Sequence, residues 1–266
     1  MKLKFFLAAF LICVANSLVM AQEANSDWPE ILGSNRNGVS AESANLGWES
    51  NPKVAWEIEV GEGFAGPVIA GGELILFHRP SSKKGSLVVE KFKASNGESV
   101  WKTELESSYP GKMDGDRGPK ATPVIRDGFV YCHGPDGELA CLNFKSGKVV
   151  WEFNAREKFN APTGYFGCGS TPLVVDDKVL LNVGSKDGAA VVAFDAKSGE
   201  VVWRAVNDTA SYSSPIAVEH DGKQMAVFLT RTRFVGLDVA TGEVQFSNPF
   251  GAVSYTHLTL PTNREV

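Results

Sequence analysis

The sequence contains little cysteine and histidine, no excess of basic residues and no long helical pattern. Its four cysteines and four histidines show no spacing typical of a zinc site. Lys and Arg number 26 against 31 Asp and Glu, without basic clusters, so nucleic acid is not an expected partner. Because 43% of the residues are apolar, the chain is neither disordered nor fibrous. Together these features indicate a folded, mildly acidic protein.

The first 21 residues have the features of an export signal. Lys2 and Lys4 precede an apolar run over residues 5–15, and small residues lead to a cleavage site after Ala21. The run is shorter than the roughly 20 apolar residues that span a bilayer, so no membrane span is expected after cleavage. The leader predicts a periplasmic or secreted protein, with an oxidising environment for the cysteines that follow.

A short segment recurs four times along the rest of the chain. The aromatic residues that end its copies are 50, 52 and 43 residues apart, a period typical of propeller or solenoid repeats. Each aromatic residue lies four residues after a glycine, and that glycine is directly preceded by Asn, Ser or Thr. We expect both columns to be structural, with the aromatics packed between repeats and the glycines in left-handed turns. The glycine column is Gly97, Gly147, Gly199 and Gly242, and the aromatic column is Trp101, Trp151, Trp203 and Phe246.

Within each repeat the pattern is that of β-strands. Short runs rich in Val, Ile, Phe and Trp follow a proline and are separated by Gly, Asp, Asn and Ser. Four strands in 43–52 residues match one blade of a propeller. The sequence therefore predicts an all-β fold, a β-propeller of four-stranded blades with about four blades present as an incomplete ring. The expected blades cover residues 61–106, 118–154, 167–206 and 210–249.

Two segments resemble a known family of propellers. Residues 193–203, AFDAKSGEVVW, resemble the tryptophan-docking motif A-x-D-x-x-[TS]-G-x-x-x-W of the quinoprotein-type propellers, and the other three copies are looser. Residues 27–40, DWPEILGSNRNGVS, are similar to the start of exported bacterial proteins with PQQ-binding-like repeats. This family includes the pyrroloquinoline-quinone (PQQ) dehydrogenases and BamB-like outer-membrane assembly proteins. The resemblance implies the fold more strongly than an activity, because the repeat itself is structural.

The resemblance implies two different functions. In the dehydrogenase relatives, PQQ lies beside a calcium ion held by Glu, Asn and Asp, and next to a disulfide between adjacent cysteines. No two cysteines are adjacent here and no such ligand set can be assigned, so we assign no catalytic, cofactor-binding or metal residue. The first hypothesis is an exported scaffold that binds a protein or cell-envelope component, without a cofactor and without catalysis. The alternative is the N-terminal part of a PQQ-dependent dehydrogenase, which would require PQQ and calcium.

The connections between repeats are longer than tight turns require. They cover residues 107–122, 154–171 and 207–214, and long loops on a rigid scaffold often carry binding sites. An equally open interpretation is that these loops only fill the central channel. The candidate binding residues on this loop face are Tyr109, Arg117, Lys120, Tyr165, Phe166 and Tyr212.

Cys132 and Cys141 are candidates for a disulfide. If Asp136-Gly137 forms a two-residue type I′ turn, the two cysteines face each other at a non-hydrogen-bonded pair of a hairpin. Their Cα atoms would then be about 4.5 Å apart, within the range that a disulfide accepts. The alternative is a register shifted by one residue, in which both cysteines stay reduced in the core.

These patterns divide the chain into four parts. Residues 1–21 form the signal peptide, 22–52 an N-terminal extended segment and 53–252 the partial propeller. The repeat breaks abruptly after that, and residues 253–266 resemble a translated sequencing adapter, so we expect a non-native tail. Residues 54–60 have the character of an outer strand with its aromatic residue, which indicates a further blade whose inner strands this sequence does not contain.

Overall fold

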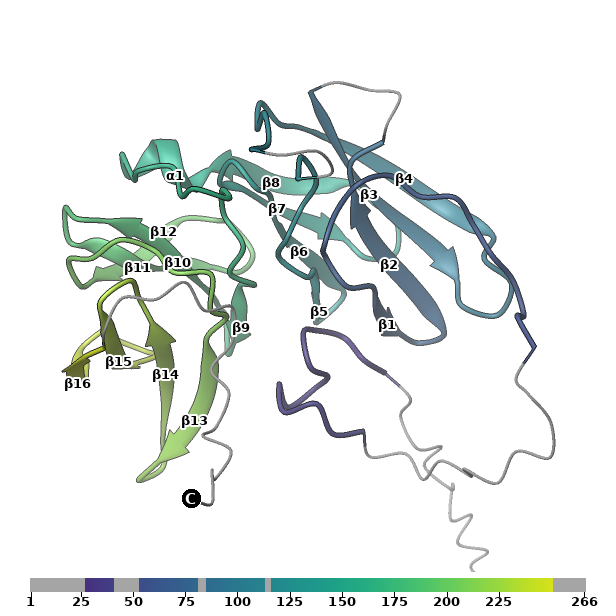
Figure 1. The fold of residues 1–266 in the computed structure, drawn as a ribbon. Helices are drawn as coiled ribbons and strands as arrows, with labels where there is room; N and C mark the ends of the chain where they lie inside the picture. Colours follow the sequence, from purple (N-terminus) through teal and green to yellow (C-terminus); the bar gives the residue numbers. More distant parts are fainter. Residues whose placement is uncertain (1–26, 41–52, 81–84, 113–115, 251–266) are drawn as a thin grey trace, which may run out of the picture.

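The computed structural model describes residues 27–40, 53–80, 85–112 and 116–250, which form four antiparallel sheets of four strands each (Figure 1). Each sheet is built from consecutive strands and is one blade, and the short helix α1 (Ala155–Lys158) follows blade 2. The predicted all-β propeller of four-stranded blades is confirmed. Blade 1 contains β1 (Val68–Ala70), β2 (Glu73–His78), β3 (Ser86–Lys93) and β4 (Ser99–Glu106); blade 2 contains β5 (Val124–Arg126), β6 (Phe129–His133), β7 (Glu138–Asn143) and β8 (Val149–Asn154); blade 3 contains β9 (Leu173–Val175), β10 (Lys178–Ser185), β11 (Ala189–Asp195) and β12 (Val201–Ala205); blade 4 contains β13 (Ile216–His220), β14 (Lys223–Leu229), β15 (Arg233–Asp238) and β16 (Val244–Pro249).

The first strand of each blade lies at the inside of the ring and the fourth lies at the outside. Strand β1 contacts β5, β5 contacts β9, and β9 contacts β13, so the four inner strands are neighbours (Figure 1). A two-residue turn joins the first two strands of every blade. In two of these turns Asp127 and Asp176 have a left-handed φ of 51°, a conformation that Asp tolerates better than most residues.

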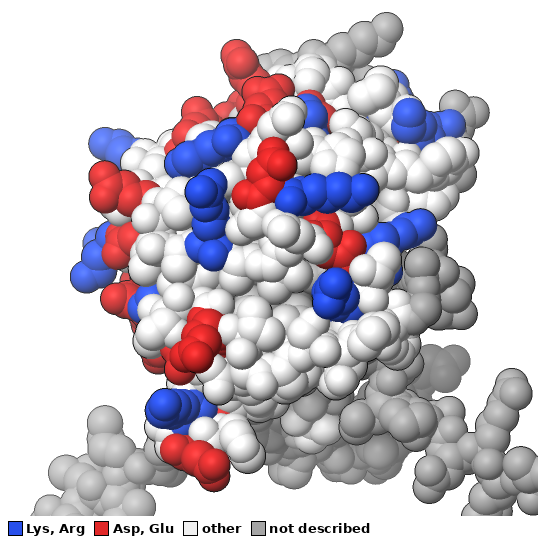
Figure 2. Space-filling view, turned by 90° about the vertical axis from the view of Figure 1, so that its left-hand side faces the viewer, with Lys and Arg blue, Asp and Glu red and all other residues white. Residues whose placement is uncertain are grey.

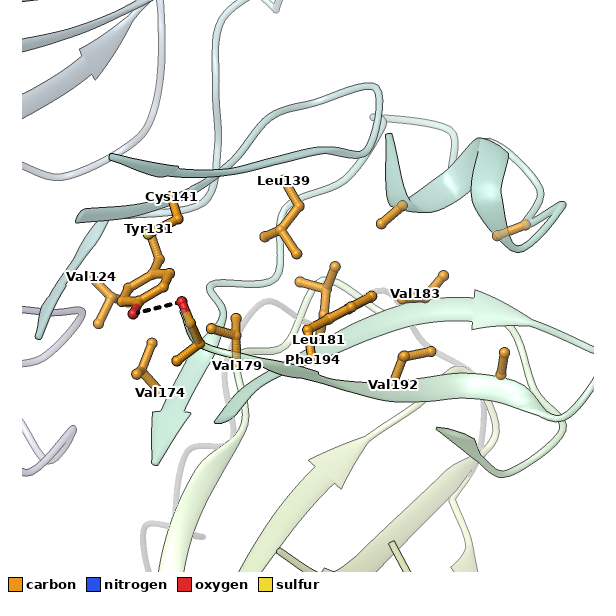
Figure 3. Close-up of a cluster of buried hydrophobic side chains, with 14 residues drawn as sticks. Val124, Tyr131, Leu139, Cys141, Val174, Val179, Leu181, Val183, Val192 and Phe194 are labelled. Atoms are coloured by element: carbon orange, nitrogen blue, oxygen red, sulfur yellow. Dashed lines mark hydrogen bonds between the residues drawn. The ribbon is translucent and has the colours of Figure 1, made fainter. Parts of the chain in front are cut away.

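The hydrophobic core lies in the seams between blades. Three buried clusters fill the three seams between consecutive blades. In the seam between blades 2 and 3, the hydroxyl of Tyr131 donates a hydrogen bond to the carbonyl of Ala196 at 3.2 Å, beside Val174 and Val179 (Figure 3). Each blade is therefore stabilised mainly by its neighbours, as in other repeat folds.

A tryptophan of one blade closes each seam by docking onto the next blade. Its indole N–H donates to the backbone carbonyl three residues before a repeat glycine, and its ring lies against that glycine. A Cβ on Gly147 would come within 2.6 Å of Trp101, so this contact requires glycine. The bonds run from Trp101 to Phe144 (3.0 Å), from Trp151 to Ala196 (3.1 Å) and from Trp203 to Val239 (3.0 Å).

The two ends of the repeat array differ from this pattern. Residues 54–60 do not form the expected strand, yet Trp56 donates to the carbonyl of Ala94 at 2.9 Å, as the other docking tryptophans do. A Cβ on Gly97 would come within 2.7 Å of the Trp56 ring. In blade 4 the aromatic column is filled by Phe246, whose ring lies 5.4 Å from that of Phe234 in the same blade.

Residues 27–40 form an N-terminal strap that crosses the inner strands of the blades. On blade 1, the backbone N–H of Trp28 donates to the carbonyl of Ile69 in β1 at 2.9 Å. On blade 2, the N–H of Ile125 in β5 donates to the carbonyl of Pro29 at 2.8 Å. The strap therefore pairs with the inner strands of two blades through backbone hydrogen bonds.

Arg36 anchors the strap to the other two blades. Its guanidinium donates to the carbonyl of Pro172 and, at 2.8 Å, to that of Pro215, the residues that precede β9 and β13. Its Nε lies 2.5 Å from Glu30 Oε2, and the two side chains are only 5% and 3% exposed. The other oxygen of Glu30 lies 3.2 Å from Arg126 of β5. One buried guanidinium thus ties blades 3 and 4 to the strap.

The expected disulfide between Cys132 and Cys141 is wrong, because both thiols are free. The hairpin has a three-residue loop: Gly137 N donates to Gly134 O at 3.2 Å, and Gly137 has a left-handed φ of 95°. The extra loop residue shifts the register by one, so Cys132 faces Ala140. Because side chains alternate between the faces of a sheet, Cys132 lies in the seam between blades 1 and 2, and Cys141 in the seam between blades 2 and 3.

The expected signal peptide and the expected non-native tail (253–266) lie outside the described residues. The described part of the chain contains no helix that is both long enough and apolar enough to cross a membrane.

Replacing Gly199 by Ala should reduce stability more than the same change at Gly222. Both glycines have a φ of 72°, but a Cβ at Gly199 would lie 2.8 Å from Trp151, whereas nothing lies within 4 Å at Gly222. The backbone conformation alone costs about 1–2 kcal/mol in each variant. We expect Gly199→Ala to lose about 2–4 kcal/mol, because the docked indole must also move. Equal denaturation midpoints for the two variants would show that the docking contact contributes nothing.

Replacing Arg36 by Met should destabilise the chain by about 3–5 kcal/mol, since the buried Glu30 carboxylate loses its closest partner. The double variant Glu30→Met/Arg36→Met should recover part of this loss, because it removes the unpaired charge. Hydrogen exchange should increase first in β9 and β13, which Arg36 holds through Pro172 and Pro215. A melting temperature of Arg36→Met equal to that of the unchanged protein would contradict this role of the strap.

Candidate functional site

Three long loops carry the chain from the outer strand of one blade to the inner strand of the next, over residues 107–123, 155–172 and 206–215. We call the surface that they form the loop face. A cleft of about 380 Å³ lies between the second and third loops and extends to the strands β6 and β10. The side chains that define it are His133, Tyr165, Phe166, Asn182, Tyr212 and Arg231.

Three of the predicted binding residues come together as an aromatic wall at this cleft. The rings of Tyr165 and Phe166 are 4.7 Å apart, and those of Phe166 and Tyr212 are 6.2 Å apart. The Tyr212 hydroxyl accepts a hydrogen bond from the backbone N–H of Phe166 at 2.9 Å, which joins the two loops. Tyr165 is 68% exposed, so the wall reaches from the cleft to the surface.

Two other predicted residues, Tyr109 and Lys120, support the loops. Tyr109 is only 1% exposed, and its hydroxyl donates to Asp116 at 3.1 Å. The Lys120 ammonium lies 4.6 Å from the centre of the Tyr109 ring and 2.9 Å from Asp116 Oδ1. A Cβ on Gly167, whose φ is 73°, would come within 2.8 Å of this ring. Tyr109 thus packs against the second loop at Gly167.

The sixth predicted residue, Arg117, is not part of the cleft. It is partly exposed, and its Nε donates to Glu62 Oε2 at 3.1 Å. The hydrogen bonds from this guanidinium lower the pKa of the Glu62 carboxyl. Arg117 therefore ties its loop to the segment that precedes β1.

The floor of the cleft is made by two buried polar residues that sequence reasoning missed. His133, at 2% exposure, places Nδ1 2.9 Å from the carbonyl of Ser170, and burial lowers its pKa to about 4. The ring is therefore neutral at neutral pH, and Nδ1, facing a carbonyl, carries its proton. Asn182 donates through Nδ2 to the carbonyl of Leu229 at 3.3 Å. The sequence signal that was available is a polar residue in a mostly apolar strand. His133 is the last residue of β6 (FVYCH), and Asn182 lies within β10 (KVLLNVGS).

The family model described as outer membrane protein assembly factor BamB matches residues 83–262. Among solved structures, BamB from Moraxella catarrhalis is similar, with a TM-score of 0.48 and 21% identity, covering 76% of this chain and 54% of that chain.

Curated relatives carry dehydrogenase names. The 1-butanol dehydrogenase (cytochrome c) of Thauera butanivorans is 38% identical over 108 residues, covering 39% of this chain and 14% of the relative. The lanthanide-dependent methanol dehydrogenase of Methylorubrum extorquens is 29% identical over 170 residues, covering 58% of this chain and 26% of the relative. The chain thus spans about a quarter or less of the length of these two relatives.

The described residues do not fit a PQQ–calcium centre of the kind that the resemblance implies. Calcium needs six to eight oxygen ligands. In residues 27–40, 53–80, 85–112 and 116–250, no group of three or more His, Cys, Asp or Glu is placed to hold a metal ion. The sequence also has no adjacent cysteines for a vicinal disulfide.

Burial of His133 should make stability depend on pH. Its folded-state pKa of about 4 lies below the ordinary value of 6.5, so between these values the unfolded chain binds the proton more readily. The free energy of unfolding should therefore fall as the pH drops from 6.5 to 4, by at most ~3 kcal/mol from this group.

The variant His133→Asn keeps an N–H donor for Ser170 and removes the titration. Urea unfolding of both proteins at several pH values should give a flatter pH profile for the variant. Parallel profiles would show that His133 does not take up the proton on unfolding.

Proposed function

Because the chain belongs to the family of the outer membrane protein assembly factor BamB, we propose that it is an exported scaffold that binds a protein partner of the cell envelope through its loop face. In this proposal the chain performs no catalysis of its own. The leader in residues 1–21 supports a periplasmic or secreted location.

The observation that carries this proposal is the aromatic wall. Tyr165 exposes 68% of its surface beside Phe166 and Tyr212, on loops that a rigid set of blades holds in place. Aromatic residues are enriched at protein interfaces, because they bury a large area at a small cost in side-chain entropy. The hydrogen bond from Phe166 N to the Tyr212 hydroxyl keeps the wall in one shape before a partner arrives.

On one side of the molecule the surface charges do not favour a polyanion as partner. Figure 2 shows Lys and Arg interspersed with Asp and Glu over the side of the molecule that lies on the left of Figure 1. A nucleic-acid surface would require a continuous basic patch.

A second candidate is part of a quinone-dependent dehydrogenase. It is supported by the names of the relatives, among them a quinoprotein ethanol dehydrogenase of Pseudomonas aeruginosa. Titration of the purified chain with PQQ and Ca²⁺, followed by the absorbance of the quinone, separates the two candidates, because only the dehydrogenase proposal expects saturable binding.

Photo-crosslinking tests the partner surface. A benzoylphenylalanine at position 165 should form an adduct of one defined mass in intact cells, because Tyr165 stands at the rim of the cleft. The matched control is the same substitution at Val202, which is 47% exposed on the outer strand β12. The same adduct from both positions, or none from position 165, would contradict binding through the loop face.

A further inference from the structure

The cleft contains a hydrogen-bond acceptor that the described residues leave unused. Asn182 is 2% exposed, and its Nδ2 donates to the carbonyl of Leu229, which fixes the orientation of the amide. The oxygen Oδ1 at the other end is buried and has no hydrogen-bond partner. Nearly all buried polar atoms in folded proteins form hydrogen bonds, so we expect this acceptor to bind a donor from outside the chain.

His133 supplies a second acceptor in the same cleft. Its Nδ1 carries the ring proton and faces the carbonyl of Ser170, which leaves Nε2 with a lone pair. No partner of Nε2 is found among the described residues. A ligand of this cleft must therefore offer two groups that donate hydrogen bonds.

The walls and the rim restrict the ligand further. Tyr165, Phe166 and Tyr212 provide apolar ring surface, and the exposed Arg231 provides donors at the rim. Among the described residues that line the cleft, none is Asp or Glu. A cationic ligand would find no opposite charge there, whereas a neutral ligand with hydroxyl groups can both donate and accept.

We propose that this cleft binds a neutral sugar, whose hydroxyl groups donate to Asn182 Oδ1 and His133 Nε2 while the ring packs on the aromatic wall. The volume of about 380 Å³ is in the range of about 300–1,000 Å³ that is usual for small-molecule sites. A peptide also donates hydrogen bonds through its backbone N–H groups, and it is the alternative ligand that a peptide probe tests. The sugar site does not require the protein partner proposed above.

Titration of the purified full chain with methyl β-D-glucopyranoside tests the proposal by ligand-observed NMR. We expect saturable binding of this glycoside and at least tenfold weaker binding of its per-O-methylated derivative, which keeps the ring but has lost every donor. Acetylglycinamide serves as the peptide probe. Equal binding of both glycosides, or binding of acetylglycinamide alone, would overturn the sugar assignment.

Two variants test the named contacts. Asn182→Leu has a similar volume and no acceptor, and should weaken glycoside binding about tenfold. Tyr165→Ala leaves the fold unchanged, because Tyr165 is largely exposed, and should weaken binding about three- to tenfold. Phe64→Ala is the control, since Phe64 is 69% exposed and does not line the cleft, and it should bind as the unchanged protein does.

The variants also separate this inference from the proposed protein partner. If both Tyr165→Ala and Asn182→Leu bind the glycoside as the unchanged protein does, then Asn182 Oδ1 serves only a buried water, and the proposal is wrong. That result leaves the crosslink from position 165 unaffected, because the crosslink is measured in cells and needs no sugar. If position 165 gives no crosslink while the glycoside still binds, only the proposal of a protein partner is wrong.

Discussion

The hydrogen bond from an indole N–H to a carbonyl of the next blade is the contact on which this structure depends. A four-stranded blade has no core of its own, so its apolar faces are buried only when the neighbouring blades stay in place. In the seam between blades 2 and 3, Trp151 and Tyr131 both donate to the carbonyl of Ala196. The glycine three residues later, Gly199, then lies against the indole, where any side chain would collide. The indole hydrogen bond and the contact between ring and glycine together fix the spacing of the blades.

The strap performs the corresponding task at the inner ends of the blades. The inner strands are short, three residues in β1, β5 and β9, and cannot hold the ring by themselves. Backbone pairing covers blades 1 and 2, and the guanidinium of Arg36 reaches the carbonyls that precede the inner strands of blades 3 and 4. Burying this charge is costly, and the structure offsets the cost with Glu30 and two carbonyl acceptors. The strap therefore fixes the inner ends of the blades, as the docked tryptophans fix the seams.

The repeat could be predicted because its turns are local. In the copy at 193–203, Asp195 Oδ1 accepts from the N–H and the hydroxyl of Ser198, so the Asp and Ser of the motif are required at their spacing. The hairpin at Asp136-Gly137 was misread for an equally local reason. The four residues 134–137, GPDG, place Pro at the second position and Gly at the fourth position of a type I turn, which adds one residue to the loop. Because of this one-residue error in register, the two cysteines lie on opposite faces of the sheet and not on the same face.

The polar floor of the cleft could not be predicted, because its partners are distant in the sequence. Asn182 donates a hydrogen bond to the carbonyl of Leu229 in the next blade, and His133 faces the carbonyl of Ser170 in the following loop. No sequence pattern links residues that lie so far apart along the chain. What places them together is the same blade spacing that the docked tryptophans set. The loops above are equally constrained, since Gly167 allows the second loop to lie against Tyr109, and Tyr212 bonds the two loops together. The candidate site is therefore a product of the seams: its floor comes from strands of neighbouring blades, and its walls come from the loops that the same blades hold apart.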